Sequence, residues 1–171
     1  MLDSILFVSL RALCVFAITV FAMNPGLNWY EDVAVGDRFA TGGIVVTEAL
    51  VQAFAGLSGD FFDLHVDDEF ARGLGFERRV AHGILGLALT DGLKNRAEYR
   101  FRAVASLGWN WKFTGPILID DRIHAEVTVL ARRETKRADR GIVTLGFKVF
   151  THKGDVVQEG TNELMMLRKP P

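Results

Sequence analysis

One apolar segment, residues 83–97, constrains the fold of this chain more than any other feature. At helical spacing its apolar side chains cover much of the circumference, and they are Ile84, Leu85, Leu87, Ala88, Leu89 and Leu93. A surface helix keeps one polar face, so a helix this apolar must be buried by something broad, such as a curved sheet. Gly86 and Gly92 lower the helix propensity of the segment by about 1 kcal/mol each. We therefore expect neighbouring backbone to approach closely at these two glycines.

The chain after this helix has the alternation of strands. Residues 122–131 alternate apolar and polar side chains, which predicts one face in the core and the other toward solvent. The last three strand segments are joined by short connections, so they should pair antiparallel. The chain is therefore predicted to be an α+β domain, with one helix against a curved antiparallel sheet. The strands expected after the helix are 101–112, 122–131, 141–151 and 156–167.

The chain before the helix predicts a strand, two shorter helices and a loop. The strand, 38–46, is weakened by two glycines in its middle. A helix should begin after Thr47, whose hydroxyl can cap free backbone amides, and run to about Ala55. A loop rich in glycine, serine and aspartate follows over 56–65, and a short helix is expected at 67–72.

That loop carries the most informative chemistry, because it places Asp60 and His65 five residues apart. Adding water to an activated double bond needs a base that takes a proton from water and an acid that delivers one to carbon. A histidine with a pKa near 6.5 and a nearby carboxylate can share those tasks through one water held between them. The alternative is structural: Asp60 caps the loop, and His65 is a hydrogen-bonded turn residue.

A second motif, Val80-Ala81-His82-Gly83, opens the apolar helix. The start of a helix presents unpaired N–H groups and a partial positive charge. Gly83 has no side chain, so a ligand can come close to its N–H. This arrangement suits a thioester carbonyl that gains negative charge as water attacks. The alternative is a plain helix start, at which His82 caps or packs.

In combination these motifs resemble the MaoC-like, (R)-specific enoyl-CoA hydratase family. The core motif of that family is Gly-Asp-x-Asn-Pro-x-His, and Gly59, Asp60 and His65 match it at the right spacing. The resemblance covers about Tyr30 to Leu167. It continues without gaps through Asp67, Phe70, Phe76-Glu77-Arg78 and Val80-Ala81-His82-Gly83 to Gly92, and resumes at Leu107-Gly108, Lys112-Phe113 and the strand from Asp121 to Val129.

The resemblance implies a hot-dog fold, in which the helix 83–97 is central and the sheet wraps it. It also implies homodimers with active sites near the subunit interface. Asp60 and His65 would activate the attacking water, and the Gly83 N–H would polarise the thioester carbonyl. The product would be a 3-hydroxyacyl-CoA, formed reversibly and without a metal or redox cofactor. The expected substrate-binding residues are Phe61, Phe62, His82 and Asp91.

Three residues depart from the family pattern. Phe62 stands where the family has asparagine, and Asp63 stands where it has proline. Asp91 stands where several members have a serine close to the catalytic aspartate. If Asp91 pointed at Asp60, the two carboxylates would form a pair of like charges, which raises one pKa. Phe61 and Phe62 are expected to shape an acyl pocket.

Charge and composition exclude several other classes of protein. The 171 residues carry 20 basic and 21 acidic side chains, a formal net charge of −1. This balance gives no electrostatic reason to bind nucleic acid or an anionic membrane. The sequence has no phosphate-binding Walker loop, no dinucleotide-binding glycine pattern and no metal-ligand spacing. The single cysteine, Cys14, cannot form an internal disulfide, which is compatible with the cytoplasm.

The N-terminal segment 1–22 is apolar and does not fit the domain pattern. Asp3 is the only charge before the apolar run, whereas a signal peptide needs positive charge there. A membrane anchor would place Arg11 near the bilayer centre, at a cost of roughly 2.5–3.5 kcal/mol. The interpretation favoured here is a misassigned start codon, with the domain beginning at Met23. We expect membrane association only if residues 1–22 are retained.

Two other functions remain open at this point. The first is hydrolysis of an acyl-CoA thioester on the same fold, which would release free CoA. The second is an acyl-thioester binding module without catalysis, which the departures at Phe62, Asp63 and Asp91 suggest. The intact Asp60, His65 and Gly83 favour hydration over both.

Overall fold

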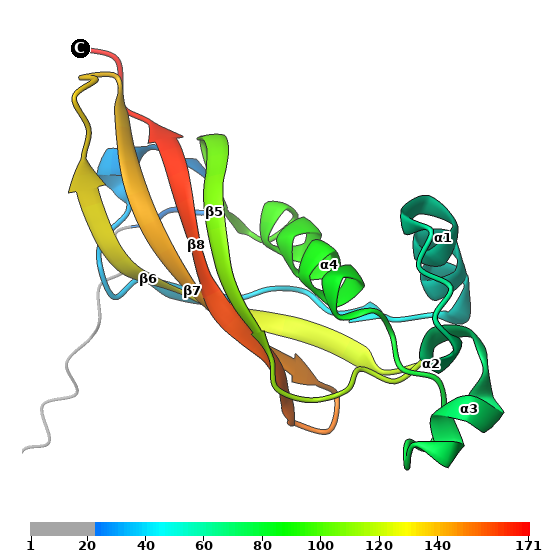
Figure 1. Cartoon of the computed structure of the whole chain (residues 1–171). Helices are drawn as coiled ribbons and strands as arrows, with labels where there is room; N and C mark the ends of the chain where they lie inside the picture. Colours follow the sequence, from blue (N-terminus) through cyan, green and yellow to red (C-terminus); the bar gives the residue numbers. More distant parts are fainter. Residues whose placement is uncertain (1–22) are drawn as a thin grey trace, which may run out of the picture.

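The computed structural model describes residues 23–171, and the apolar segment 1–22 lies outside the described residues. One six-stranded sheet runs in the order β2-β6-β7-β8-β5, with β3 also paired to β6. Helix α4 lies on one face of this curved sheet, and α1, α2 and α3 gather at one end of the molecule (Figure 1). The strands are β1 (Gly26–Asn28), β2 (Arg38–Ala40), β3 (Ile44–Val45), β4 (Tyr99–Phe101), β5 (Ala103–Phe113), β6 (Arg122–Glu134), β7 (Arg140–Thr151) and β8 (Val156–Leu167). The helices are η1 (Tyr30–Asp32), α1 (Glu48–Ser58), α2 (Asp63–Val66), α3 (Asp68–Gly73) and α4 (Gly83–Asn95).

The long strands pair as the sequence predicts. β6 pairs with β7, and β7 pairs with β8, both antiparallel. The apolar residues Ile123, Ala125 and Val127 of β6 are fully buried, while Arg122 and Glu126, which alternate with them, are exposed. The strand expected at 38–46 instead divides into β2 and β3. Between them, the Thr41 hydroxyl accepts a hydrogen bond from the Ala125 amide and interrupts the regular ladder.

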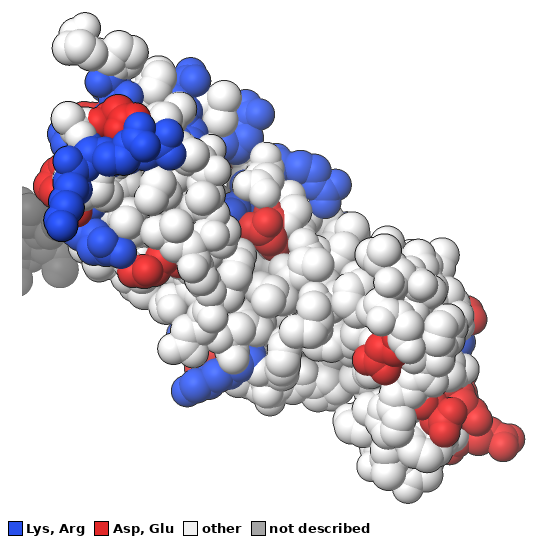
Figure 2. All heavy atoms as spheres, turned by 45° about the horizontal axis from the view of Figure 1, so that its top comes forward, with Lys and Arg blue, Asp and Glu red and all other residues white. Residues whose placement is uncertain are grey.

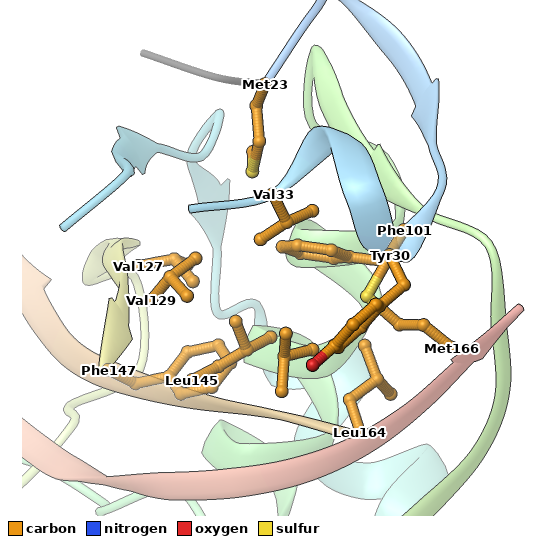
Figure 3. Packing of buried hydrophobic residues seen from close by; sticks show 11 residues of the cluster. Met23, Tyr30, Val33, Phe101, Val127, Val129, Leu145, Phe147, Leu164 and Met166 are labelled. Atoms are coloured by element: carbon orange, nitrogen blue, oxygen red, sulfur yellow. The ribbon is translucent and has the colours of Figure 1, made fainter. Parts of the chain in front are cut away.

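Buried side chains form two clusters along the inner face of the sheet. One lies near η1, where Met23, Val33 and Phe101 pack on residues of β6, β7 and β8 (Figure 3). The other lies between α1, α4 and the sheet, and it includes Val51, Leu85 and further residues of β6 and β7. This second cluster holds the beginning of α4 against the sheet.

Helix α4 is buried on one side only, because a single curved sheet covers one side of a helix. Leu85 and Leu93 face the sheet, whereas Ile84 is 55% exposed. The close approach expected at Gly86 is present, although side chains rather than backbone make it: a Cβ there would lie 2.7 Å from Ile117 Cδ1 and closer still to the Gln158 amide nitrogen. The same expectation is wrong for Gly92, where a Cβ would meet nothing within 4 Å.

The region between β3 and α4 contains one more helix than the sequence predicts. Thr47 caps α1 by accepting a hydrogen bond from the Leu50 amide, as expected. The helix runs three residues past the expected end, to Ser58, and is capped by Gly59, whose φ of 78° is the left-handed conformation that glycine adopts easily. The predicted loop 56–65 is therefore shorter, and its second half is the single turn α2. None of the helices within residues 23–171 is long and apolar enough to cross a membrane.

Candidate active site

The segment 80–83 leads into the start of α4 and is hydrogen bonded to a neighbouring loop. Val80 forms an isolated bridge with Leu118, and the Ala81 amide donates to the Ile117 carbonyl at 2.8 Å. Just before the segment, the Arg79 amide donates to Asp68 of α3 at 2.8 Å. That hydrogen bond is the main cause that lowers the pKa of the Asp68 carboxyl. Segment 80–83 therefore has a defined position relative to the sheet and α3.

His65 of α2 reaches this segment through its ring. Its Nδ1 lies 2.6 Å from the Val80 carbonyl oxygen. Because a carbonyl can only accept a hydrogen bond, Nδ1 carries the proton in the neutral ring. Nε2 then has the free lone pair, and in this form the histidine can take a proton from water.

Asp60 lies on the short turn between α1 and α2 and reaches the same segment through its backbone. Its carbonyl oxygen accepts a hydrogen bond from His82 Nε2 at 2.9 Å. The carboxylate accepts a hydrogen bond from the Phe62 amide at 3.2 Å, and its other oxygen lies 4.0 Å from His82 Nε2. The Asp60 side chain is 52% exposed, so the carboxylate is open to solvent and to a ligand.

Asp60, His65 and His82 form one compact group. The rings of His65 and His82 are in contact, with centroids 3.8 Å apart and an interplanar angle of 30°. One nitrogen or oxygen from each of the three side chains lies within 4.8 Å of the others. Such a group could hold a water molecule or a divalent cation. Because a ring nitrogen of each histidine is already hydrogen bonded to a backbone carbonyl, each ring has only one nitrogen left for either role.

Gly83 presents its N–H beside this group, at the first position of α4. Within residues 23–171 this N–H has no acceptor, as expected for the first turn of a helix. A Cβ on Gly83 would lie 2.9 Å from ring carbons of Phe113, so only glycine lets β5 pass this close. The structure thus brings together Asp60, His65 and Gly83, the three residues that the sequence predicts to be catalytic.

The sequence did not identify Gln158, which supports Gly83 from the sheet. Its side chain is almost completely buried; Nε2 donates to the Gly83 carbonyl at 3.0 Å, and Oε1 accepts from Trp111 Nε1 at 3.0 Å. The available signal was the register of β8, where a polar residue occupies the same inward-facing set as Leu164 and Met166. A glutamine in that position must find buried partners.

The four predicted substrate-binding residues do not all reach this site. Phe62 packs edge-on against the His65 ring with centroids 6.1 Å apart, and Phe61 is beside it and exposed. His82 lies within the group. Asp91 does not: it is eight residues along α4 from Gly83, a rise of about 12 Å. Its carboxylate accepts a hydrogen bond from Lys94 Nζ at 2.6 Å, so the condition for a carboxylate pair, that Asp91 points at Asp60, is not met.

Basic side chains gather at the far end of the molecule from this group. In the view of Figure 2, lysine and arginine concentrate near the β6–β7 hairpin, while acidic residues mark the end with α1, α2 and α3. The hairpin arginines are paired locally: Arg137 and Arg140 contact Asp139, and Arg133 contacts Glu163. The hydrogen bond from Arg137 lowers the pKa of Asp139. These arginines therefore belong to the solvated β6–β7 hairpin and are not part of the candidate site.

Comparisons with known proteins find relatives in both sequence and structure. An (R)-specific enoyl-CoA hydratase from Aeromonas caviae is 38% identical over 112 residues, which cover 66% of this chain and 80% of that protein. The crystal structure of a MaoC-like dehydratase from Rhodospirillum rubrum has a TM-score of 0.75 and 33% identity, and covers 84% of this chain and 99% of that one.

The fold is confirmed by a more distant structure. A Mycobacterium tuberculosis protein described as a double hot dog has a TM-score of 0.74 at 19% identity, and covers 84% of this chain and 45% of that one. The architecture seen here, with α4 on the curved antiparallel sheet, is a hot-dog fold. The family model for the MaoC-like domain matches residues 32–149, a range that contains α1 to α4 and the whole Asp60 group. The chain therefore belongs to the MaoC-like domain family.

Proposed function

We propose that this protein catalyses the reversible hydration of a trans-2-enoyl-CoA to a 3-hydroxyacyl-CoA. The observation that carries the proposal is the 2.6 Å contact between His65 Nδ1 and the Val80 carbonyl, which fixes the proton on Nδ1 of the neutral ring and leaves Nε2 as the base. A ring nitrogen of His65 and a carboxylate oxygen of Asp60 lie within 4.8 Å of each other. The relatives named as hydratases and dehydratases support the same reaction class.

The proposed chemistry uses one water held between Asp60 and His65. One member of the pair takes a proton from that water while the water oxygen forms a bond to C3 of the substrate. Electrons of the C2–C3 double bond move toward the thioester carbonyl, and a proton held by the pair is delivered to C2. The product gains one hydroxyl on C3 and one hydrogen on C2. The proposal requires neither a metal nor a redox cofactor.

Gly83 would act on the charge that develops during this step. Its N–H is the natural donor to the thioester oxygen, since it has no acceptor among the described residues and lies at the positive end of α4. Loss of one such donor typically costs about 10²–10³-fold in rate. The buried Gln158 holds the carbonyl of the same residue, so the orientation of the first turn is restrained from the sheet side.

The acyl chain would lie against the apolar side chains that border the group. Phe61 and Phe62 are 57% and 53% exposed, and Phe113 approaches from β5. In a single chain these rings are open to solvent. A second copy would cover them, which leads to the proposal that the active form is a homodimer.

The exposed edge of the sheet supports this assembly. β5 is the terminal strand of the sheet order and carries exposed Val104, Leu107 and Phe113. Ile84 of α4 is also exposed. An apolar edge strand is a site for pairing with another chain unless it is covered. We expect a dimer mass by light scattering during gel filtration; a monomer at micromolar concentration would contradict this part of the proposal.

The experiment that tests the function is loss of enoyl absorbance from crotonyl-CoA and longer trans-2-enoyl-CoAs, with free thiol measured in parallel. Asp60→Asn should lower kcat by at least about 10²-fold, since general acid–base groups contribute about 10²–10⁴-fold. Asp63→Asn is the matched control: it makes the same chemical change on an exposed carboxylate three residues away and should leave kcat unchanged.

Each other outcome of this assay points elsewhere. Thiol release would indicate thioester hydrolysis on the same fold. Binding of enoyl-CoA without turnover would indicate a binding module. Equal activity of Asp60→Asn and the wild-type protein would contradict the role assigned to Asp60.

A further inference from the structure

His82 was expected to bind substrate, but its position suggests a different role. It is 2% exposed and stands at the N-cap position of α4, yet its ring makes no capping hydrogen bond to that helix. It points instead toward the α1–α2 turn, where Nε2 donates to the Asp60 carbonyl at 2.9 Å. A buried ring that a ligand reaches poorly is better suited to holding other groups than to binding substrate.

The turn that carries Asp60 has little else to hold it. The Asp60 amide donates to the Ser58 hydroxyl at 3.2 Å, and the Phe62 amide donates to the Asp60 carboxylate at 3.2 Å. Both bonds are local, within two residues. Among the described residues, the bond from His82 is the one hydrogen bond that ties Asp60 to α4. Without it, α2 is still held to Val80 through Leu64 and His65, but Asp60 itself has no hydrogen bond outside its own turn among the described residues.

The same ring also contacts His65. Its ring packs against the His65 ring with centroids 3.8 Å apart, and against the ring of Phe54 of α1 with centroids 5.0 Å apart. His82 is therefore in contact with both members of the acid–base pair and is attached through the chain to Gly83. Its Nδ1 is buried without a partner among the described residues, so the Nε2 bond is the one hydrogen bond that orients this ring.

We propose that His82 is a positioning residue, whose Nε2–H bond to the Asp60 carbonyl sets the distance between the Asp60 carboxylate and His65. This inference rests on the proposed hydration. A misplacement of about 1 Å in a reacting group can cost about 10²-fold in rate. The effect should appear in kcat and not in KM, because His82 is buried behind the groups that meet the substrate.

Two substitutions separate the hydrogen bond from the ring. His82→Phe keeps an aromatic ring against His65 but has no donor for the Asp60 carbonyl. His82→Gln has no ring, but its amide extends about as far as Nε2 and can donate. We expect kcat to fall about 10–100-fold in His82→Phe, with KM within about 3-fold of wild type. His82→Gln should keep kcat within about 5-fold of wild type.

A second measurement does not depend on activity. Hydrogen exchange of the amides of residues 59–65, followed by mass spectrometry on the full chain, should be faster in His82→Phe and near wild type in His82→Gln. If His82→Phe does not fold, His82→Asn replaces it, because the shorter amide cannot reach the Asp60 carbonyl.

The results that would overturn the proposal are distinct from those that would overturn hydration. Wild-type kcat in His82→Phe, equal losses in the two variants, or a loss carried wholly by KM would each show that this hydrogen bond does not position Asp60. If the wild-type protein hydrates no enoyl-CoA, the proposed function fails. The exchange measurement then still decides whether His82 holds the turn.

Discussion

Gly86→Ala in α4 should destabilise the protein, whereas Gly92→Ala in the same helix should stabilise it. A Cβ on Gly86 would lie 2.7 Å from Ile117 Cδ1 and closer still to the Gln158 amide, which donates to the Gly83 carbonyl. A Cβ on Gly92 would meet nothing within 4 Å. Both variants replace glycine by alanine in the same helix. The neighbouring side chains therefore determine whether each variant is more or less stable than the wild type.

The magnitudes follow from three contributions. Replacing glycine by alanine inside a helix gains about 1 kcal/mol in either position. At Gly86, overpacking costs about 1–3 kcal/mol, and loss of the Gln158 hydrogen bond costs about 1 kcal/mol. The net loss is therefore about 1–3 kcal/mol for Gly86→Ala, against a gain of up to about 1 kcal/mol for Gly92→Ala. At roughly 2–4 °C per kcal/mol for a chain of this size, Tm should fall by about 2–12 °C and rise by up to about 4 °C, respectively.

Differential scanning calorimetry of both variants measures these shifts at one protein concentration. Gly86→Ala should also lower kcat, because the displaced Gln158 carboxamide no longer restrains the Gly83 carbonyl. Shifts in Tm of the same sign and size in the two variants would refute the argument that the Gln158 side chain requires a glycine at position 86. A destabilised Gly86→Ala with unchanged kcat would show that the Gln158 bond supports the fold and not the reaction.

Three further predictions concern metal, pH and the N-terminal segment. Dialysis against EDTA should leave kcat within about 2-fold of its starting value, since the proposed chemistry is general acid–base catalysis; a loss restored by Zn²⁺ would show that the Asp60 group works through a cation. Lys169 donates a hydrogen bond to the Asp32 carboxylate, which lowers the pKa of Asp32 in the folded protein. The stabilisation from this bond is present above the pKa of about 3.9 in the unfolded chain, and it is lost as the pH falls through the lower pKa of the folded state. Tm should therefore fall less between pH 5 and pH 3 in Asp32→Asn than in the wild type, and parallel profiles would argue against this contribution. Removal of residues 1–22 should leave a folded protein with unchanged kcat; failure to fold would show that the segment belongs to the domain.

The elements that the sequence predicted well are those with a local periodic signal. The alternation in 122–131 and the apolar spacing in 83–97 are each visible within a few consecutive residues. The predicted strand is present as β6 and the predicted helix as α4. The match of Asp60 and His65 to a known motif was also local in the chain. The prediction that they lie close to Gly83 came from the resemblance to the family, because no pattern in residues 60–83 predicts how the chain folds between them.

The features that the sequence missed depend on contacts between distant segments. β1 pairs with β4 in parallel across more than 70 residues, and neither three-residue strand has an alternation long enough to recognise. Gln158 meets Gly83 only because β8 and α4 pack together. Asp91 was placed near Asp60 by analogy, but its own helix offers Lys94 one turn away, and that nearer cation takes the carboxylate.

The departures from the family motif can be understood from where the site is attached. An asparagine at position 62 would orient the loop from within, yet here the Asp60 carbonyl and the His65 ring are each hydrogen bonded to the segment 80–83. A phenylalanine at that position leaves both bonds intact and packs against the outer side of His65. Because the backbone of 80–83 supplies the acceptor for His65 and the N–H of Gly83, substitutions in the loop should change the shape of the acyl pocket more than the acid–base geometry. Restoring asparagine by Phe62→Asn should then alter the preferred chain length of the enoyl-CoA while kcat on crotonyl-CoA changes little.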